Sequence, residues 1–234
     1  GKLDTNIHSI ICYNYPAIAE YRVKRICKKN NALFIPDVTE WYGTSSNGYV
    51  TSLIKWIDTS LRMRGVNFLA DGRITTSTYL TEFYISKVNN IVELPTLYDK
   101  IALKNNVEFF QKNDQKIKRI LYAGNPFSAN TSKNSKSGVK ERLDKVIALL
   151  GKVENKNFIL DIYGIDKNRY LEVYPGHADL LYMLNGQIIF NGRRAHSEVI
   201  NAIANSDFTI FFRDTNRVTK AGFPSKYSES IACG

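Results

Sequence analysis

The chain has little of what disulfide-rich, zinc-binding and membrane-spanning proteins need. Its three cysteines, Cys12, Cys27 and Cys233, are far apart and odd in number, and no two form a Cys-x-x-Cys pair. This spacing argues against a disulfide framework or a zinc site and fits a reducing cytoplasm. No apolar run approaches the roughly 20 residues that cross a bilayer, and no charged-then-apolar leader opens the sequence. We therefore expect a cytoplasmic protein.

What is present is the composition of a folded, basic protein. Hydrophobic residues make up 44% and charged residues 23% of the 234 positions, which excludes a disordered chain. The net charge of +10 is uneven, with 12 Lys/Arg against 9 Asp/Glu in residues 1–100 and 20 against 13 in residues 101–234. A basic C-terminal half suits a nucleotide, a nucleic acid or an acidic membrane surface, and it equally suits a solvated lysine-rich face.

Short apolar runs alternate with helical patterns along the chain. The runs are rich in β-branched residues and apolar nearly throughout, which predicts parallel strands covered on both faces. They span residues 7–12, 32–38, 89–95, 119–124, 158–164, 187–192 and 208–213. Helical periods at 139–150 and 197–207 lie between them, so we expect an α/β, doubly wound architecture.

A polar stretch divides this pattern in two. The Lys- and Asn-rich residues 101–118 predict a connector, with an N-terminal α/β domain at 1–100 before it and a C-terminal α/β domain at 119–234 after it. Each domain is expected to be Rossmann-like and built on a parallel sheet.

Glycines and arginines gather where the strands of the second domain end. Gly124 and Asn125 follow its first strand, Gly164 its second, Arg193 its third, and Arg213 ends its fourth. Ligands of open α/β sheets bind at this carboxyl edge. Glycine lets a ligand approach the backbone, and arginine offers donors for phosphate oxygens. Each glycine alone fits a plain turn; together they favour a ligand site.

The stretch "TKAGFPSKYSESIACG" (219–234) adds a loop that opens a helix. Gly222 permits a tight backbone, Pro224 fixes the entry and Ser225 is a good N-cap. Free N–H groups at a helix start favour phosphate. Glu229, one turn further on, leans back toward that start and is placed to accept hydrogen bonds from sugar hydroxyls. An ordinary acidic residue near a helix N-terminus is the competing interpretation.

The same stretch resembles the donor-binding signature of family 4 (group 1) GT-B glycosyltransferases of bacterial polysaccharide biosynthesis. "YAGNP", "LDIYG" and "IIFNGRRAHSEVINAIANSDFTIFFR" match the order of that family's nucleotide-sugar domain. "DVTEWYG" (37–43), "ADGRITTSTYLTEFY" (70–84) and "ELPTLYDK" (93–100) look like its partner-domain motifs. The resemblance covers nearly the whole chain and implies two Rossmann-like domains, both incomplete here, in a chain truncated at both ends.

The resemblance also implies roles for particular donor-side residues. Glu229 would bind the ribose hydroxyls, and Phe223, Pro224, Ser225 and Lys226 would line the sugar and diphosphate. Gly124 would open the phosphate loop, and the stretch from Arg193 to His196 would lie near the base or ribose. Such enzymes generally retain anomeric configuration and stabilise the leaving diphosphate with cations. We therefore expect no metal and no cofactor, since the nucleotide-sugar is a substrate.

Departures from the family pattern fall on charged positions. The first Glu of the usual Glu-x7-Glu pair is Ala221, the usual phosphate-clamping Arg is Asn125, and the Lys that follows it corresponds to Lys136. Catalytic charge is then expected from Arg213 first. Further cations that could supply it are Arg217, Lys220 and Lys226.

Three residues of the first domain are acceptor-side candidates. Asp37 and Glu40 follow a strand and are either acceptor contacts or helix-start acids. Arg73, in "ADGRIT", reaches a phosphate or forms a surface ion pair.

The sequence thus predicts part of a hexosyltransferase that moves sugar from a UDP- or GDP-sugar to a glycan or lipid-linked acceptor. The product would be a surface or capsular polysaccharide, and the protein would contact the cytoplasmic membrane face peripherally. The alternative is a non-catalytic basic module that binds nucleic acid or anionic surfaces, but no reading helix or aromatic-rich strand motif supports nucleic acid. A nicotinamide dehydrogenase is disfavoured because no Gly-x-Gly-x-x-Gly follows any strand.

Overall fold

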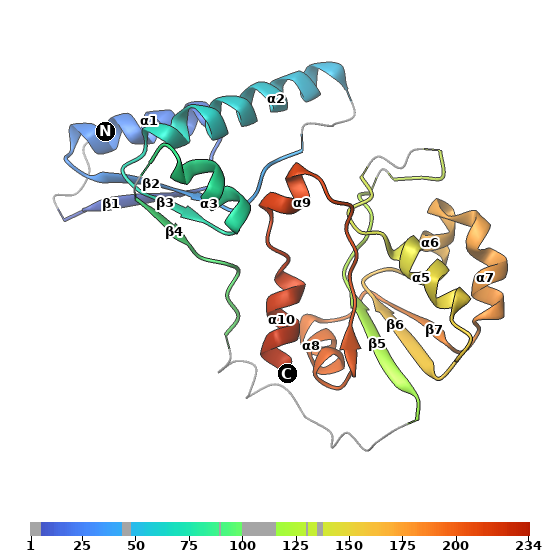
Figure 1. Cartoon of the computed structure of the whole chain (residues 1–234). Coiled ribbons are helices and arrows are strands. Elements are labelled where there is room, and N and C mark those ends of the chain that lie inside the picture. Colours follow the sequence, from blue (N-terminus) through green and yellow to red (C-terminus); the bar gives the residue numbers. More distant parts are fainter. Residues whose placement is uncertain (1–5, 44–47, 89, 100–115, 130, 135–137) are drawn as a thin grey trace. The chain divides into compact units, whose positions relative to one another are not determined.

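The computed structural model describes residues 6–43, 48–88, 90–99, 116–129, 131–134 and 138–234. The chain forms two compact units (Figure 1). The first comprises residues 1–97 and 215–224, and the second comprises residues 98–214 and 225–234. The segment 215–224 therefore packs with the first unit although it lies far from it in sequence.

The first unit is built on a parallel sheet with strand order β1-β2-β3-β4. Helical crossovers join successive strands, as parallel pairing requires. Its elements are β1 Ser9–Tyr13, α1 Ala17–Lys29, β2 Leu33–Val38, α2 Tyr49–Arg64, η1 Val66–Leu69, β3 Arg73–Thr75, α3 Thr78–Ile85, β4 Ile91–Glu93 and α9 Arg217–Ala221.

One face of this sheet is covered by α1 and α2, which lie together over it (Figure 1). Alternation along the strands turns Cys12 and Phe34 into the core beneath α1. Their neighbours Ile11 and Leu33 point the other way and are exposed, as is Val92 on β4. Strands covered on both faces were the prediction, and for the described part of the first unit it was wrong.

The second unit contains a parallel sheet with strand order β7-β6-β5-β8. Its elements are β5 Lys118–Ala123, α5 Leu143–Lys152, β6 Phe158–Tyr163, α6 Lys167–Val173, η2 Pro175–His177, α7 Ala178–Met183, β7 Ile188–Gly192, α8 His196–Ala204, β8 Phe208–Thr209 and α10 Ser225–Cys233.

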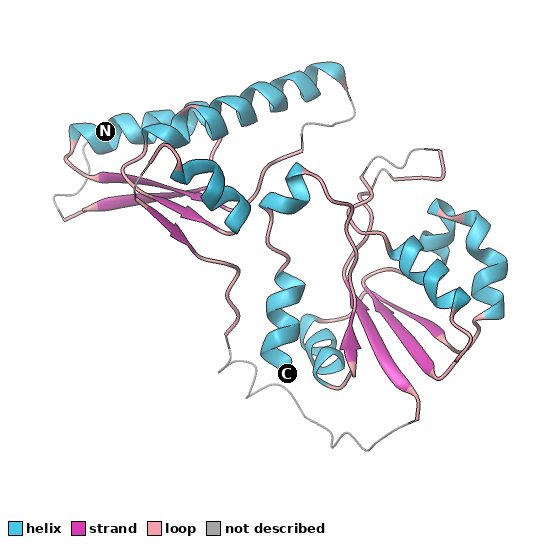
Figure 2. Cartoon of the chain, viewed as in Figure 1, coloured by secondary structure: helices cyan, strands magenta, loops and turns pink. Residues whose placement is uncertain are grey.

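Helices cover both faces of this second sheet (Figure 2). Leu160 and Ile162 of β6 pack with Val146 and Ile147 of α5 in the larger core. On the opposite face Leu121 of β5 packs with residues of α8 and α10. The near-continuous apolar pattern of these strands therefore reflects burial on two sides, as expected for a doubly wound sheet.

The strand order places a topological switch point beside β5. From β5 the chain proceeds to β6 and β7 on one side, and then returns to place β8 on the other side. The connections on either side of β5 diverge from it, and in such folds ligands bind at the carboxyl edge near this point. The residues that follow β5 and β8 define the candidate site of the second unit.

Candidate functional site

A buried glutamate is the centre of the switch point. Glu141, in the loop before α5, is only 2% exposed at its side chain, and both of its carboxylate oxygens lie 2.5 Å from Lys226 Nζ. Arg213 Nη2 donates to Oε1 at 3.0 Å, and the Tyr122 hydroxyl donates to Oε2 at 2.5 Å. We call these four residues the Glu141 cluster. With two cations and one carboxylate, the cluster carries a net charge of +1.

Burial and the charges within the Glu141 cluster shift the pKa values of its members. Burial would raise the pKa of Glu141, but the charge of Lys226 and the hydrogen bonds from Lys226, Tyr122 and Arg213 outweigh it and lower that pKa. Burial lowers the pKa of Lys226 from its ordinary value, against the opposing effect of the Glu141 carboxylate. Burial and then the Glu141 charge raise the pKa of Tyr122, so its hydroxyl stays protonated and remains a donor.

Two glycines make room for this arrangement. Gly124 has a φ of 138°, and a Cβ on it would lie 2.4 Å from Cε and from Nζ of Lys226. Gly164 has a φ of 99°, and its Cβ would lie 2.6 Å from the carbonyl oxygen of Gly124. Any other residue at either position would be strained in the backbone and would displace a neighbour. Gly164 thus serves first to let β6 and β5 end side by side.

The helix α10 brings a second acidic residue to the same unit. It begins at Ser225, and Glu229 lies one turn along it. Glu229 Oε1 lies 3.4 Å from Nε2 of His196, the first residue of α8. Both residues were predicted from sequence to lie near a bound ribose, and the fold brings their side chains together.

The remaining predicted donor-side residues of this unit are more dispersed. Asn125 is exposed, and its Oδ1 accepts a hydrogen bond from the Phe127 N–H at 3.1 Å, which shapes the turn after β5. Arg193 is exposed in the loop between β7 and α8. Lys136 lies outside the described residues.

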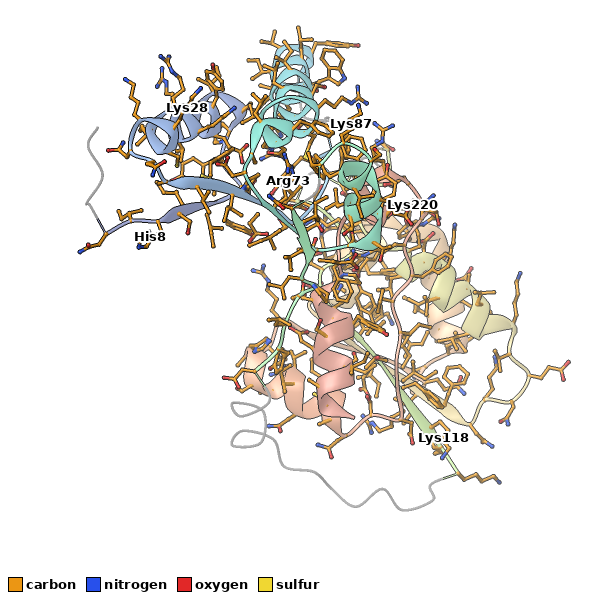
Figure 3. The ribbon with its side chains drawn as sticks, turned by 60° about the vertical axis from the view of Figure 1, so that its left-hand side comes forward. His8, Lys28, Arg73, Lys87, Lys118 and Lys220 are labelled. Carbon is orange, nitrogen blue, oxygen red and sulfur yellow. The ribbon has the colours of Figure 1, made fainter. Side chains whose placement is uncertain are left out.

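Four predicted site residues belong to the first unit: the catalytic candidate Lys220 and the donor-binding candidates Gly222, Phe223 and Pro224. Lys220 is exposed on the short helix α9 (Figure 3). This helix is anchored by the Ser77 hydroxyl, which donates to the Ala221 carbonyl at 2.7 Å, and by Arg217, whose guanidinium lies 4.9 Å from the centroid of the Trp41 ring. Trp41 is buried in the core of this unit.

The acceptor-side candidates differ from one another in their surroundings. Asp37 is the last residue but one of β2 and lines a small cavity, which the exposed Glu40 also lines. Arg73 is buried between β3 and its neighbours (Figure 3), where its guanidinium donates to the carbonyls of Asn67 and Ala70. These two carbonyls engage Arg73 inside the unit instead of a surface ion pair, and its acceptor-side role stays a prediction.

Sequence reasoning missed Glu141 and Tyr122. The expected helix from residue 139 would place Glu141 among its solvated side chains, whereas α5 begins only at Leu143 and leaves Glu141 in a loop. Within the chain section 138–142, Val139 forms an isolated bridge with Phe127 instead. A run of three charged residues, Lys140 to Arg142, is the only sequence signal, and it does not distinguish a buried acid from exposed ones.

Two classes of feature are absent from the part of the chain that the structure describes. No group of three or more His, Cys, Asp or Glu side chains converges as a metal site would require. None of the described helices combines the length and the apolar character needed to cross a membrane.

Comparison with known proteins gives structural likeness without sequence likeness. No family model matches the chain, and no curated protein matches it by sequence. Solved structures do match. The lipopolysaccharide outer core galactosyltransferase WaaB in its apo form has a TM-score of 0.60 at 13% identity, over 96% of this chain and 54% of that one.

Two further structures agree. Anabaena HepE in complex with UDP has a TM-score of 0.57 at 11% identity, covering 95% of this chain and 57% of that one. Sucrose-phosphate synthase from Thermosynechococcus elongatus has a TM-score of 0.55 at 13% identity, covering 97% and 54%. The chain thus spans little more than half the length of these proteins. It has the α/β fold of the GT-B glycosyltransferases, with two parallel four-stranded sheets, as the sequence predicted.

Proposed function

We propose that this chain is part of a retaining glycosyltransferase and that its second unit binds a UDP- or GDP-sugar. The observation that carries the proposal is the Glu141 cluster: a net positive group of side chains at the topological switch point of a Rossmann-like sheet. Diphosphate groups bind at this position in such sheets. The likeness to HepE in complex with UDP agrees with this ligand class.

The two cations have the exposure that a phosphate clamp needs. The side chains of Lys226 and Arg213 are 20% and 30% exposed, whereas Glu141 beneath them is almost fully buried. Glu141 fixes Lys226 and Arg213 in position before any ligand arrives, so little reorganisation accompanies binding. As the bond from the sugar to the diphosphate breaks, negative charge grows on the leaving diphosphate. Lys226 and Arg213 stabilise that charge without a metal or a cofactor.

Other residues of the second unit complete the donor site in this proposal. Glu229 accepts hydrogen bonds from the ribose hydroxyls, and His196 orients the Glu229 carboxylate from 3.4 Å away. Gly124 leaves room for the Lys226 side chain and Gly164 for the Gly124 carbonyl, so both glycines support the phosphate-binding group indirectly, and Arg193 lies toward the base. Lys220 stays a candidate cation for catalysis, and Gly222 to Pro224 stay donor-binding candidates, as the sequence predicts.

We further propose that the transferred sugar is a hexose and that the acceptor is a growing surface or capsular polysaccharide, attached to a lipid. A lipid-linked acceptor requires contact with the cytoplasmic face of the membrane. The described surface of α1 and α2 supports this. Helix α2 exposes Tyr49, Leu53, Ile54 and Trp56, and α1 exposes a row of cations that includes Lys28 (Figure 3). Aromatic and aliphatic side chains beside cations suit an anionic bilayer.

The test of donor binding is a titration of the chain with UDP, GDP, ADP and a short DNA duplex at 50 and 300 mM salt. The proposal predicts saturable binding of UDP or GDP that salt weakens only moderately. Absence of binding to every nucleotide, combined with DNA binding that falls steeply with salt, would support the basic-module alternative and refute the proposal.

A further inference from the structure

A small polar cavity lies at the carboxyl edge of the first unit's sheet. Its wall is formed by Asn14 just after β1, Asp37 at the end of β2, Glu20 of α1, Arg62 of α2 and Asn67 of η1. It leaves about 10 Å³ for the centre of a water molecule, which is about the room that one water or one hydroxyl group occupies. The carboxyl edge of a parallel sheet is where ligands bind in open α/β folds.

Unpartnered polar atoms concentrate at this cavity. Within the described residues, four buried side-chain nitrogen or oxygen atoms have no hydrogen-bond partner: Glu20 Oε2, Asp37 Oδ1, Arg62 Nε and Asn67 Oδ1. All four residues line the cavity. Glu20, Arg62 and Asn67 are buried, with 2%, 7% and 1% of their surface exposed. Buried polar atoms are almost always hydrogen-bonded in folded proteins, so four orphans around one cavity indicate a polar occupant.

The charges at the cavity define that occupant. Three carboxylic acids, Glu20, Asp37 and Glu40, line it against one guanidinium, Arg62. Phosphate and carboxylate groups would be repelled by the acids. A metal ion would have to share the cavity with the positive charge of Arg62. A neutral group is left, and it must accept from the Arg62 Nε–H while donating to Asp37 or Asn67. A hydroxyl does both.

The surroundings of the cavity suit a carbohydrate. Arg62 is held in place because its Nη1 donates to the Tyr15 carbonyl at 3.1 Å and to Asn14 Oδ1 at 3.3 Å. Tyr42 packs against it, with the guanidinium carbon 4.4 Å from the centroid of the Tyr42 ring. Asn14 adopts a left-handed φ of 54°, which asparagine accommodates more readily than most residues, and this turn places its side chain beside Arg62. A half-buried tyrosine beside a polar pocket offers both an apolar face and hydrogen-bonding groups.

We propose that this cavity is a subsite for one hydroxyl of a neutral sugar, which accepts a hydrogen bond from the Arg62 Nε–H and donates its own proton to Asp37 or to Asn67, with Glu20 beside it. Without the sugar, a single water takes the same place. The inference rests on the proposed glycosyl transfer, in which the sugar is the acceptor. It extends the acceptor-side prediction from Asp37 to Glu20, Arg62 and Asn67, which no sequence pattern had indicated.

The test is saturation-transfer NMR on the whole chain with 10 mM methyl α-glycosides of glucose, galactose, mannose and N-acetylglucosamine, each with and without saturating UDP. Glucose 6-phosphate is the anionic probe. The proposal predicts transfer to at least one neutral glycoside and none to the phosphate. Arg62→Lys, which keeps the charge but removes the Nε–H, should reduce the signal at least fivefold. Arg64→Lys, two positions along α2, is the matched control and should leave the signal unchanged.

A second variant keeps the test informative if Arg62→Lys fails to fold. Asp37→Asn keeps the shape of the side chain and should also reduce transfer at least threefold, while circular dichroism stays that of the wild type. No transfer to any neutral glycoside, or transfer unaffected by both variants, would overturn the inference. UDP titration of the same samples separates the two proposals, because glycoside binding without any nucleotide binding would contradict the proposed donor site and leave this cavity's assignment intact.

Discussion

Glu141 determines the arrangement of side chains in the second unit's site, because its carboxylate binds Lys226, Arg213 and the Tyr122 hydroxyl. Replacing it with Gln leaves Lys226 and Arg213 close together without a counter-charge. Removal of one partner from a buried ion pair costs about 3 kcal/mol, and both cations are partly solvated, so we expect a loss at this lower end of the range. Denaturant unfolding of Glu141→Gln should show it.

The matched control for that variant is Glu172→Gln. Glu172 accepts from Arg169 at 2.8 Å but is 63% exposed at its side chain, so its loss should cost less than about 1 kcal/mol. Equal losses in the two variants would mean that Glu141 contributes no more than a surface ion pair does.

Glu20 gives the first unit a specific dependence on pH. Burial raises the pKa of Glu20 from 4.5 to about 7, with the nearby Asp58 adding to the increase and Arg62 opposing it. A carboxyl group with a raised folded-state pKa binds its proton more tightly in the folded chain. The stability of the fold should therefore fall as pH rises from about 4.5 to 7, by about 3 kcal/mol in total.

Unfolding of the wild type and of Glu20→Gln at pH 5, 6, 7 and 8 measures this effect. The variant lacks the titrating group, so its free energy of unfolding relative to wild type should rise across this range. A difference that does not vary with pH would show that Glu20 titrates normally.

Two strand ends show why a glycine position cannot be judged from sequence alone. Gly164 was expected to admit a ligand, and the fold gives it a prior role, because its missing Cβ leaves room for the Gly124 carbonyl. Gly164→Ala should destabilise the second unit by about 2 kcal/mol through the strained φ and the close contact. Gly176→Ala is the control, since nothing lies within 4 Å of its Cβ position.

Thermal unfolding of both glycine variants provides the measurement. We expect a lower melting temperature for Gly164→Ala and an unchanged one for Gly176→Ala. If Gly164→Ala melts at the same temperature as the wild type, the close contact between the ends of β5 and β6 does not contribute to stability.

Several elements were predictable because burial on two sides leaves a clear pattern. The runs predicted at 119–124, 158–164 and 187–192 correspond to β5, β6 and β7 within a residue or two. Strand β3 was missed, since its three residues, Arg73 to Thr75, include polar side chains that hydrogen bonds bury. The start of α5 was predicted four residues early because Val139 fits the helical period but pairs with Phe127.

Residues of the candidate site could be predicted only where the residue type itself indicates its function. Arg213 and Lys226 were named from sequence because the family's phosphate-clamping arginine is replaced by Asn125, so that other cations were needed. Their common partner Glu141 was not named, because nothing in the sequence indicates that the fold will bury this charged side chain. The same holds for Glu20 and Asn67, whose unpartnered atoms exist only in the folded first unit.

At the scale of the whole molecule, the charge of +10 and the exposed apolar residues of α2 together predict binding to anionic lipid. The chain should sediment with vesicles that contain 30% phosphatidylglycerol and remain in solution with pure phosphatidylcholine. Trp56→Ser should weaken this binding about fivefold by removing an interfacial aromatic ring. Tyr182→Ser, at an exposed aromatic residue of the second unit, should not change it. Equal binding to both kinds of vesicle would argue against an electrostatic contribution.

The central claim is that the Glu141 cluster binds the diphosphate of a nucleotide. Calorimetric titration with UDP and with UMP tests it most directly, because UMP lacks the second phosphate of the diphosphate that the cluster is proposed to bind. The wild type should bind UDP at least tenfold more tightly than UMP, which corresponds to about 1.4 kcal/mol. Lys226→Gln should bring the two affinities close together while leaving that for UMP nearly unchanged. A UDP to UMP affinity ratio that Lys226→Gln does not alter would contradict the account.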